Sequence, residues 1–233
     1  MNFPLETVLA LLEQEVRGLQ VPVVDLIAAQ TSDPFKVLVA TILSARTKDE
    51  VTAAASRRLF ERAGTPQELA GLSVAELEQL IYPVGFFRNK ARHLSQLPEA
   101  LATRFQGEVP SSIEELITLP GVGRKTANLV RTVAFSLPAI CVDTHVHRIM
   151  NIWGYVETTT PLQTEMALRR KLPEQYWLSF NSILVAFGQG ICRPVAPHCD
   201  ACCISAYCPR LGVTPQKTSK KRNIMHTGQE ILT

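Results

Sequence analysis

The sequence contains no run that approaches the roughly 20 consecutive apolar residues of a membrane-spanning helix. Its first segment, MNFPLETVLALLEQEVRGLQ, mixes charged and apolar residues at helical spacing and lacks the basic start and continuous apolar stretch of a secretory signal. We therefore expect an intracellular protein that does not enter a membrane. Thiols stay reduced in that compartment, so the six cysteines indicate metal binding or packing rather than disulfides.

The signals of a β-sheet are also missing. No Asn-Gly or Asp-Gly pair joins two alternating apolar runs, and no Gly/Ser-rich linker or low-complexity block divides the chain. Helix-start signals are frequent instead. Asp33-Pro34 is typical of an N-cap followed by proline, and capping-box patterns begin at Thr65, Ser73, Ser112 and Thr160. With apolar residues following at three- and four-residue steps, we predict an all-α fold of about ten or more short helices.

Six, two and five residues separate four cysteines near the C-terminus, Cys192, Cys199, Cys202 and Cys208. So short a stretch can close round one metal centre at little entropic cost. A four-iron cluster takes four cysteine ligands. Structural zinc also takes four, but usually as two C-x₂-C pairs, and this segment has one such pair. The spacing therefore favours the cluster over zinc, and the reducing compartment disfavours a disulfide framework. Cys203 does not fit the ligand spacing, and Cys141 is expected to be a buried apolar residue.

A proline–glycine loop, LPGVG at residues 119–123, lies between two predicted helices. Pro120 prevents the first helix from continuing, and Gly121 and Gly123 permit positive φ and the close approach of another backbone. The next helix starts near Gly123, so its first N–H groups suit a phosphate. Such contacts hold a protein on DNA without reading its sequence. A plain tight turn is the alternative for Gly-x-Gly alone, but the full LPGVGRKTA string is far more specific.

Two residues near this loop are candidates for chemistry. Lys125 lies in the first turn of the second helix, where its amine is a candidate nucleophile for a Schiff base; simple phosphate binding is the alternative. Asp143, in VDTHVHR at residues 142–148, is predicted to cap the next helix. A carboxylate in this position can also hold a water molecule or stabilise a developing cation. His145 and His147 are two residues apart and do not share a helix face, so we do not expect them to form a metal pair.

Charge adds little to this picture. The net charge of +3 is a weak indication of a polyanionic partner. One basic run stands near the C-terminus and consists of Lys217, Lys220, Lys221 and Arg222. We interpret it as a solvated tail, with a supporting phosphate contact as the alternative.

Together, LPGVGRKTANLV, VDTHVHR and the four-cysteine spacing resemble the endonuclease III family of DNA glycosylases. The resemblance runs over nearly the whole chain, from DPFKVLVATILSARTKDEVT to Cys208. It implies two helical domains with a DNA-binding cleft between them. One would be a helical bundle with a helix-hairpin-helix motif, residues 28–137. The other would combine residues 1–27 with 138–233 and carry a C-terminal iron–sulfur cluster loop.

The resemblance also implies an activity. A damaged nucleotide in double-stranded DNA would be flipped out of the stack, an oxidised pyrimidine excised and the abasic site cleaved by β-elimination. Lys125 matches the family's Schiff-base lysine and Asp143 its catalytic aspartate. Cys192, Cys199, Cys202 and Cys208 match the ligands of one 4Fe-4S cluster. The residues expected to contact DNA are Arg46, Phe86, Gly121, Gly123, Arg124 and Thr126. The enzyme would be a cytoplasmic monomer, associated with the nucleoid if the source is prokaryotic.

The sequence departs from the family pattern at one position that bears on specificity. Arg46 stands where many members have Gln in the loop that fills the emptied stack, so the opposite-base preference is open. Phe86 or Phe87 falls where a wedging apolar side chain is expected. The segment between Cys192 and Cys199 contains one arginine, Arg193, and one histidine, His198. A segment with more basic residues would bind DNA phosphates more tightly.

Two other functions are compatible with parts of this pattern. A mismatch glycosylase that removes adenine or thymine is one, but relatives of that kind usually lack a lysine at the position of Lys125. A non-catalytic DNA-binding or redox-sensing module is the other. The combination of Lys125 with Asp143 argues against it, since binding alone needs neither.

Overall fold

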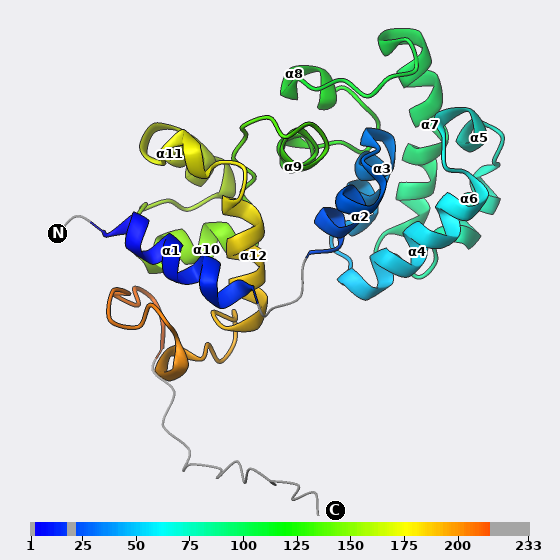
Figure 1. Cartoon of the computed structure of the whole chain (residues 1–233). Coiled ribbons are helices and arrows are strands. Elements are labelled where there is room, and N and C mark those ends of the chain that lie inside the picture. The colour runs from blue at the N-terminus through cyan, green and yellow to red at the C-terminus, as the bar shows by residue number, and fades with distance from the viewer. Residues whose placement is uncertain (1–2, 18–21, 215–233) are drawn as a thin grey trace, which may run out of the picture.

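The computed structural model describes residues 3–17 and 22–214 (Figure 1). All regular elements in these residues are helical, which confirms the predicted all-α fold. The α-helices are α1 (Leu5–Val16), α2 (Val23–Thr31), α3 (Pro34–Ser44), α4 (Asp49–Arg62), α5 (Pro66–Ala70), α6 (Val74–Ile81), α7 (Phe87–Phe105), α8 (Ile113–Leu116), α9 (Arg124–Phe135), α10 (Thr144–Ile152), α11 (Pro161–Lys171) and α12 (Phe180–Gly190). Two 3₁₀ turns, Glu174–Tyr176 and Cys199–Ala201, follow α11 and α12.

The predicted helix starts are confirmed. Asp33 accepts a hydrogen bond from the backbone N–H of Phe35 at 2.9 Å, with Pro34 in the first turn. Thr65 and Ser73 each form a complete capping box. The complete boxes predicted at Ser112 and Thr160 are wrong in one respect. Both residues cap their helices, but Glu115 accepts from the Ser112 hydroxyl, and Gln163 from Thr159, instead of from the N–H of the cap residue.

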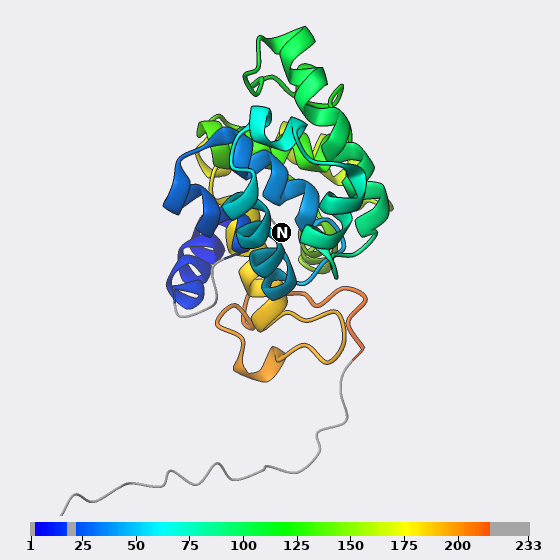
Figure 2. The same cartoon turned by 90° about the vertical axis from the view of Figure 1, so that its right-hand side faces the viewer.

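The helices gather round two main hydrophobic cores (Figure 1). The first core is built from α3 to α9, and its central residues include Leu38, Leu59 and Leu94. The second joins α1 to α10, α11 and α12, so the N-terminal helix packs with the C-terminal third of the chain. Trp153 and Phe187 are fully buried in it. The cysteine-bearing segment after α12 lies against the second core, at the end of the molecule away from α7 and α8 in both views (Figure 2).

A smaller cluster lies beside the first core. Val23 and Val24 of α2 pack against Val37 and Ala40 of α3, together with Leu129 of α9 and Cys141. The packing of α2 on α3 begins before residue 28, where the boundary between the two domains is predicted. The domain limits themselves therefore stay a prediction. Cys141 is buried as expected, and burial raises the pKa of its thiol to about 12.

Within the described residues, every helix is too short or too polar to cross a membrane. The basic run at Lys217, Lys220, Lys221 and Arg222 lies outside the described residues.

Candidate active site

The proline–glycine loop joins α8 to α9 as a tight hairpin. Gly121 has φ = +76°, and a Cβ added there would stand 2.9 Å from Nδ1 of His93. Gly123 is the N-cap of α9 and has φ = −93°, so it does not use the positive φ that a glycine permits. A Cβ at Gly123 would meet no atom within 4 Å. The chain's own packing therefore explains the glycine at 121 but not the one at 123, where the backbone is open to an external group.

The start of α9 offers backbone donors without a competing side chain. Gly123 provides no side-chain cap for the first N–H groups of the helix. Arg124, in contrast, is already engaged, because its guanidinium donates to the carboxylate of Glu165 on α11 at 2.9 Å. Thr126 is half-buried and Lys125 is exposed. The predicted DNA contacts of these residues stay predictions.

Lys125 and Asp143 line one cavity of about 400 Å³, together with Arg46. Its walls come from α2, the loop between α3 and α4, the first turns of α9 and α10, and α12. Asp143 caps α10 as predicted, with Oδ1 accepting from the N–H of Val146 at 2.8 Å. Its second carboxylate oxygen is not used by that cap. The cavity thus combines an exposed primary amine, a carboxylate held by its helix and a guanidinium at its edge.

Sequence reasoning missed an acidic part of the same wall. Asp25 of α2 and Asp49 of α4 both line the cavity. The Ser182 hydroxyl on α12 donates to Asp25 at 2.6 Å, and Asp49 accepts from the N–H of Val23 at 3.3 Å. Burial raises the pKa of Asp25, partly opposed by the bond from Ser182. The one available signal was a lone carboxylate in the apolar run VVDLIAA of residues 23–29.

His145 also lines this cavity. Burial lowers its pKa despite the nearby charge of Asp143, so the imidazole is neutral at pH 7. A Cβ at Gly188 of α12 would stand 2.5 Å from Nδ1 of His145, so the close packing of α10 on α12 depends on that glycine. His147, which does not line the cavity, bonds through Nδ1 to the hydroxyl of Thr164 at 2.7 Å. The two histidines therefore have separate surroundings.

Arg46, which lines the cavity, forms an exposed pair with Phe86, which does not line it. Both have left-handed backbone conformations, with φ of 54° and 58°. The Arg46 guanidinium lies over the Phe86 ring at 5.6 Å from its centroid, and 60% of Phe86 is exposed. Phe87 is only partly exposed, because it packs against the first core and contacts the Tyr82 ring edge-on. Of the two phenylalanines considered as a wedge, Phe86 is the one available to an external partner.

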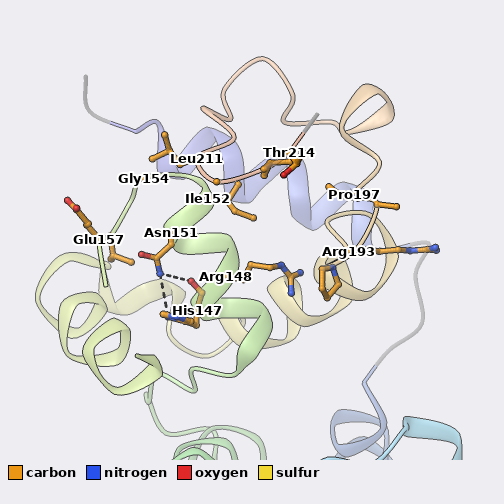
Figure 3. A pocket seen from close by; sticks show the side chains of 15 residues that line it. His147, Arg148, Asn151, Ile152, Gly154, Glu157, Arg193, Pro197, Leu211 and Thr214 are labelled. Carbon is orange, nitrogen blue, oxygen red and sulfur yellow. Dashed lines mark hydrogen bonds between the residues drawn. The ribbon is translucent and has the colours of Figure 1, made fainter. Parts of the chain in front are cut away.

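A larger cavity lies elsewhere in the described residues, in the half of the molecule that holds the cysteines, and has a volume of about 940 Å³ (Figure 3). His147, Arg148 and Asn151 of α10 face it from one side and Arg193 from another. Neither Lys125 nor Asp143 lines it. Chemistry, rather than volume, therefore identifies the smaller cavity as the candidate active site.

The four cysteines selected by spacing line one narrow cavity, whose wall also includes Trp153, Phe187 and Ile204. Burial raises the pKa of Cys192 and Cys208 and raises that of Cys202 to about 11. Cys203 does not line this cavity. Within residues 3–17 and 22–214, no three His, Cys, Asp or Glu side chains are close enough together to hold a single metal ion.

Comparison with known proteins agrees with this arrangement. Residues 39–174 match the family described as "HhH-GPD superfamily base excision DNA repair protein". "Endonuclease III" of Thermotoga maritima is 49% identical over 177 residues, which are 76% of this chain and 83% of that protein. The chain spans 54% and 51% of the lengths of two Arabidopsis thaliana homologues.

Two solved structures are similar over most of the chain. One is titled "Structure of a non-covalent Endonuclease III-DNA Complex", with a TM-score of 0.81 and 33% identity, covering 90% of this chain and 96% of that one. The other is titled "Structure of a Trapped Endonuclease III-DNA Covalent Intermediate: Estranged-Adenine Complex", with a TM-score of 0.73 and 35% identity, covering 84% and 95%.

Proposed function

Since the chain belongs to the endonuclease III family of the HhH-GPD superfamily, we propose that it excises oxidised pyrimidines from DNA and cleaves the abasic site, with Lys125 as nucleophile and Asp143 as its partner. The observation that supports this assignment is that Lys125 and Asp143, from α9 and α10, line one cavity. Binding alone requires neither an exposed amine nor a carboxylate beside it. The covalent DNA complex of a relative is consistent with a nucleophilic amine.

The reaction follows from these two groups. The amine of Lys125 attacks C1′ of the damaged nucleotide, the bond from C1′ to the base breaks, and the base leaves with the electron pair and takes up a proton. We assign two roles to Asp143: it stabilises the cation that develops at C1′, and it accepts a proton from the attacking nitrogen. The sugar ring then opens to a Schiff base between Lys125 and C1′. Loss of a proton from C2′ and departure of the 3′ phosphate cleave the strand, and water releases the lysine.

The hairpin supplies binding rather than chemistry. Donors at the start of α9 suit a backbone phosphate, and Gly123 leaves room for it. This contact holds the strand beside Lys125 without reading sequence. The acidic wall of Asp25 and Asp49 repels phosphate, so the flipped base, rather than the backbone, is the part of the nucleotide that fits there.

The cysteine cavity suits one 4Fe-4S cluster held by Cys192, Cys199, Cys202 and Cys208. All four cysteines line this cavity, and their spacing, with a single C-x₂-C pair, favours a four-iron cluster over structural zinc. Such a cluster supplies a covalent crosslink to a segment that has one 3₁₀ turn and little other regular structure.

Borohydride trapping on a duplex with a single thymine glycol tests the assignment. The wild-type chain should form a stable covalent adduct and nick the strand, whereas Lys125→Gln should do neither and still bind DNA. Lys48 is a second lysine that lines the cavity, so Lys48→Gln is the matched control and should still be trapped. Undiminished trapping of Lys125→Gln would mean that another amine is the nucleophile.

Two further comparisons separate the alternatives. Asp143→Asn should slow turnover and keep the fold, because an amide oxygen can still cap α10. Excision from a mismatched duplex at a higher rate than from the thymine glycol duplex would favour a mismatch glycosylase. Binding without excision of any base would favour a non-catalytic module.

A further inference from the structure

Lys90 is a buried cation that the proposed reaction does not use. It lies on α7 with 6% of its surface exposed. Its Nζ donates to the carbonyl oxygens of Leu43 at 2.8 Å and Ala45 at 2.6 Å, and to the hydroxyl of Thr47 at 3.2 Å. The ion pairs in the described residues do not include it. Burying an ammonium group without a carboxylate partner costs free energy, so packing alone does not explain a lysine at position 90.

The three acceptors are the end of α3 and the loop that follows it. Leu43 is in the last turn of α3 and Ala45 is its C-cap, so their carbonyls lack the usual helical partners. A cation is favourable at this negative end of the helix dipole. The next residue is Arg46, whose left-handed φ of 54° makes the loop dependent on such external support.

Thr47 extends the connection to the second loop. Its hydroxyl accepts from Nζ of Lys90 and from the N–H of Gly85 at 3.1 Å, and donates to the carbonyl of Ala45 at 3.3 Å. The hydroxyl thereby uses its single donor and both acceptor positions. A Cβ at Gly85 would stand 2.4 Å from the carbonyl oxygen of Arg46, so the two loops are in close contact. Phe86 follows directly, and its ring lies under the Arg46 guanidinium.

This arrangement presents two planar groups side by side, the Arg46 guanidinium, which lines the cavity, and the exposed Phe86 ring. A phenyl ring and a guanidinium both stack on nucleobases, and apolar side chains inserted between base steps unstack them. Resting on the proposed function, we propose that Lys90 is a positioning residue for base extrusion: its three hydrogen bonds hold the loops of Arg46 and Phe86 so that both side chains enter the DNA stack together. Lys90 acts through these loops and touches no reacting atom.

Burial lowers the pKa of Lys90 to about 8, so the amine is mainly charged at pH 7. A methionine has a similar length and apolar stem, but it donates no hydrogen bond. In Lys90→Met the carbonyls of Leu43 and Ala45 lose their charged donor. The loop that carries Arg46 keeps its hydrogen bond to Gly85 through Thr47 but loses its side-chain bonds to α7.

The test compares two substrates that differ in the need for extrusion. A paired thymine glycol must be flipped against stacking, whereas a preformed abasic site has no base to unstack. Under single-turnover conditions, Lys90→Met should slow base excision about tenfold, equivalent to about 1.4 kcal/mol, and slow cleavage of the abasic site much less. The ratio of excision rates opposite guanine and adenine should also move toward one, because the side chains that face the unpaired base lose their fixed geometry.

Two further variants control for folding. Lys171→Met removes a bond of the same kind from the exposed Lys171 of α11, beside the second core, where Nζ donates to the carbonyl of Tyr155 at 2.6 Å, and it should leave the ratio of the two rates unchanged. Thr47→Val removes the shared acceptor without removing the charge and should lower excision selectively, even if Lys90→Met fails to fold. Equal loss on both substrates, after correction for the folded fraction, would make Lys90 purely structural and overturn the inference. A wild-type chain that processes neither substrate would instead refute the proposed function itself.

Discussion

Arg124 and Glu165 form a forked ion pair between α9 and α11, with Nε 2.9 Å from Oε2 and Nη2 2.9 Å from Oε1. Arg169 donates to the same carboxylate at 2.9 Å and to Asn128 of α9 at 3.0 Å. Only 5% of the Glu165 side chain is exposed, whereas 41% of Arg124 is. One buried carboxylate therefore ties the helix that carries Lys125 to the second core through two cations.

Replacing this carboxylate should reduce stability more than it changes DNA binding. We predict that Glu165→Gln lowers the free energy of unfolding by about 2 kcal/mol, because charge-assisted hydrogen bonds to both arginines are lost. Arg124→Met should cost less, since Arg124 is half-exposed and Arg169 still compensates Glu165. Urea unfolding of the two variants and the wild type measures the difference.

The same variant tests the expected role of Arg124 in DNA binding. If the ion pair occupies the guanidinium, Arg124→Met should leave the salt dependence of binding to undamaged duplex unchanged. A direct phosphate contact would instead reduce the slope of log K against log salt by about 0.9. A gel-shift titration at several salt concentrations distinguishes these two outcomes. A reduced slope would support the phosphate contact of Arg124 that the sequence predicts.

Replacing the two hairpin glycines by alanine should affect protein stability differently and DNA binding similarly. Gly121→Ala forces a Cβ into left-handed backbone and against His93, so we predict a loss of about 1–2 kcal/mol. Gly123→Ala meets no atom in the folded chain and should leave thermal stability unchanged. Its binding to damaged and undamaged duplex should nonetheless fall in parallel, because the added methyl group stands where a phosphate approaches. Loss of lesion preference alone would place Gly123 in the base pocket instead.

Helix starts and the order of the motifs could be predicted from the sequence because they are local. An N-cap such as Ser73 needs only its own third neighbour, and Asp143 caps α10 within one turn. Cysteine spacing is also local, so the four residues that line one cavity were identified by counting.

The rest of the site depends on contacts between distant segments, which periodicity does not encode. Asp25 meets Ser182 from the far end of the chain, and Lys90 reaches the end of α3 from α7. Arg124 is an example of such a distant contact. Its position at a helix start predicts a phosphate contact, but in the structure its guanidinium forms an ion pair with Glu165 of α11. Gly123 shows the opposite case, since its role becomes visible only when the space around it is known.

Asp25 gives a prediction for pH. Burial raises the pKa of Asp25 in the folded protein above the ordinary 3.8. At pH values between the unfolded and the folded pKa, the folded protein therefore binds more protons than the unfolded chain. As the pH rises through this range, Asp25 destabilises the fold increasingly. Asp25→Asn should therefore be more stable than wild type at pH 7.5, and the advantage should shrink as the pH falls toward 4. An amide oxygen can still accept from Ser182. Calorimetry of both proteins at several pH values checks the trend, and an advantage independent of pH would contradict it.

The four cysteines give a prediction about the metal. Protein expressed under anaerobic conditions should be yellow-brown and contain about four irons per chain, whereas colourless, zinc-loaded protein would reverse the choice of cofactor. Serine at Cys192, Cys199, Cys202 or Cys208 should lower the soluble yield, because the segment after α12 has little regular structure to hold it once a ligand is lost. Cys203→Ser is the matched control, since Cys203 lies beside Cys202 but outside their cavity. It should retain both iron and yield.

Removal of the iron should act on that segment before the rest of the chain. Burial raises the pKa of Cys202 to about 11, so without a metal this thiol is protonated at neutral pH and no longer crosslinks the loop. Limited proteolysis after chelation should therefore cut first between Cys192 and Cys208 and leave α3 to α9 intact, because their core does not include this segment. Cleavage that begins in the first core would mean that the cluster supports the whole fold rather than its own loop.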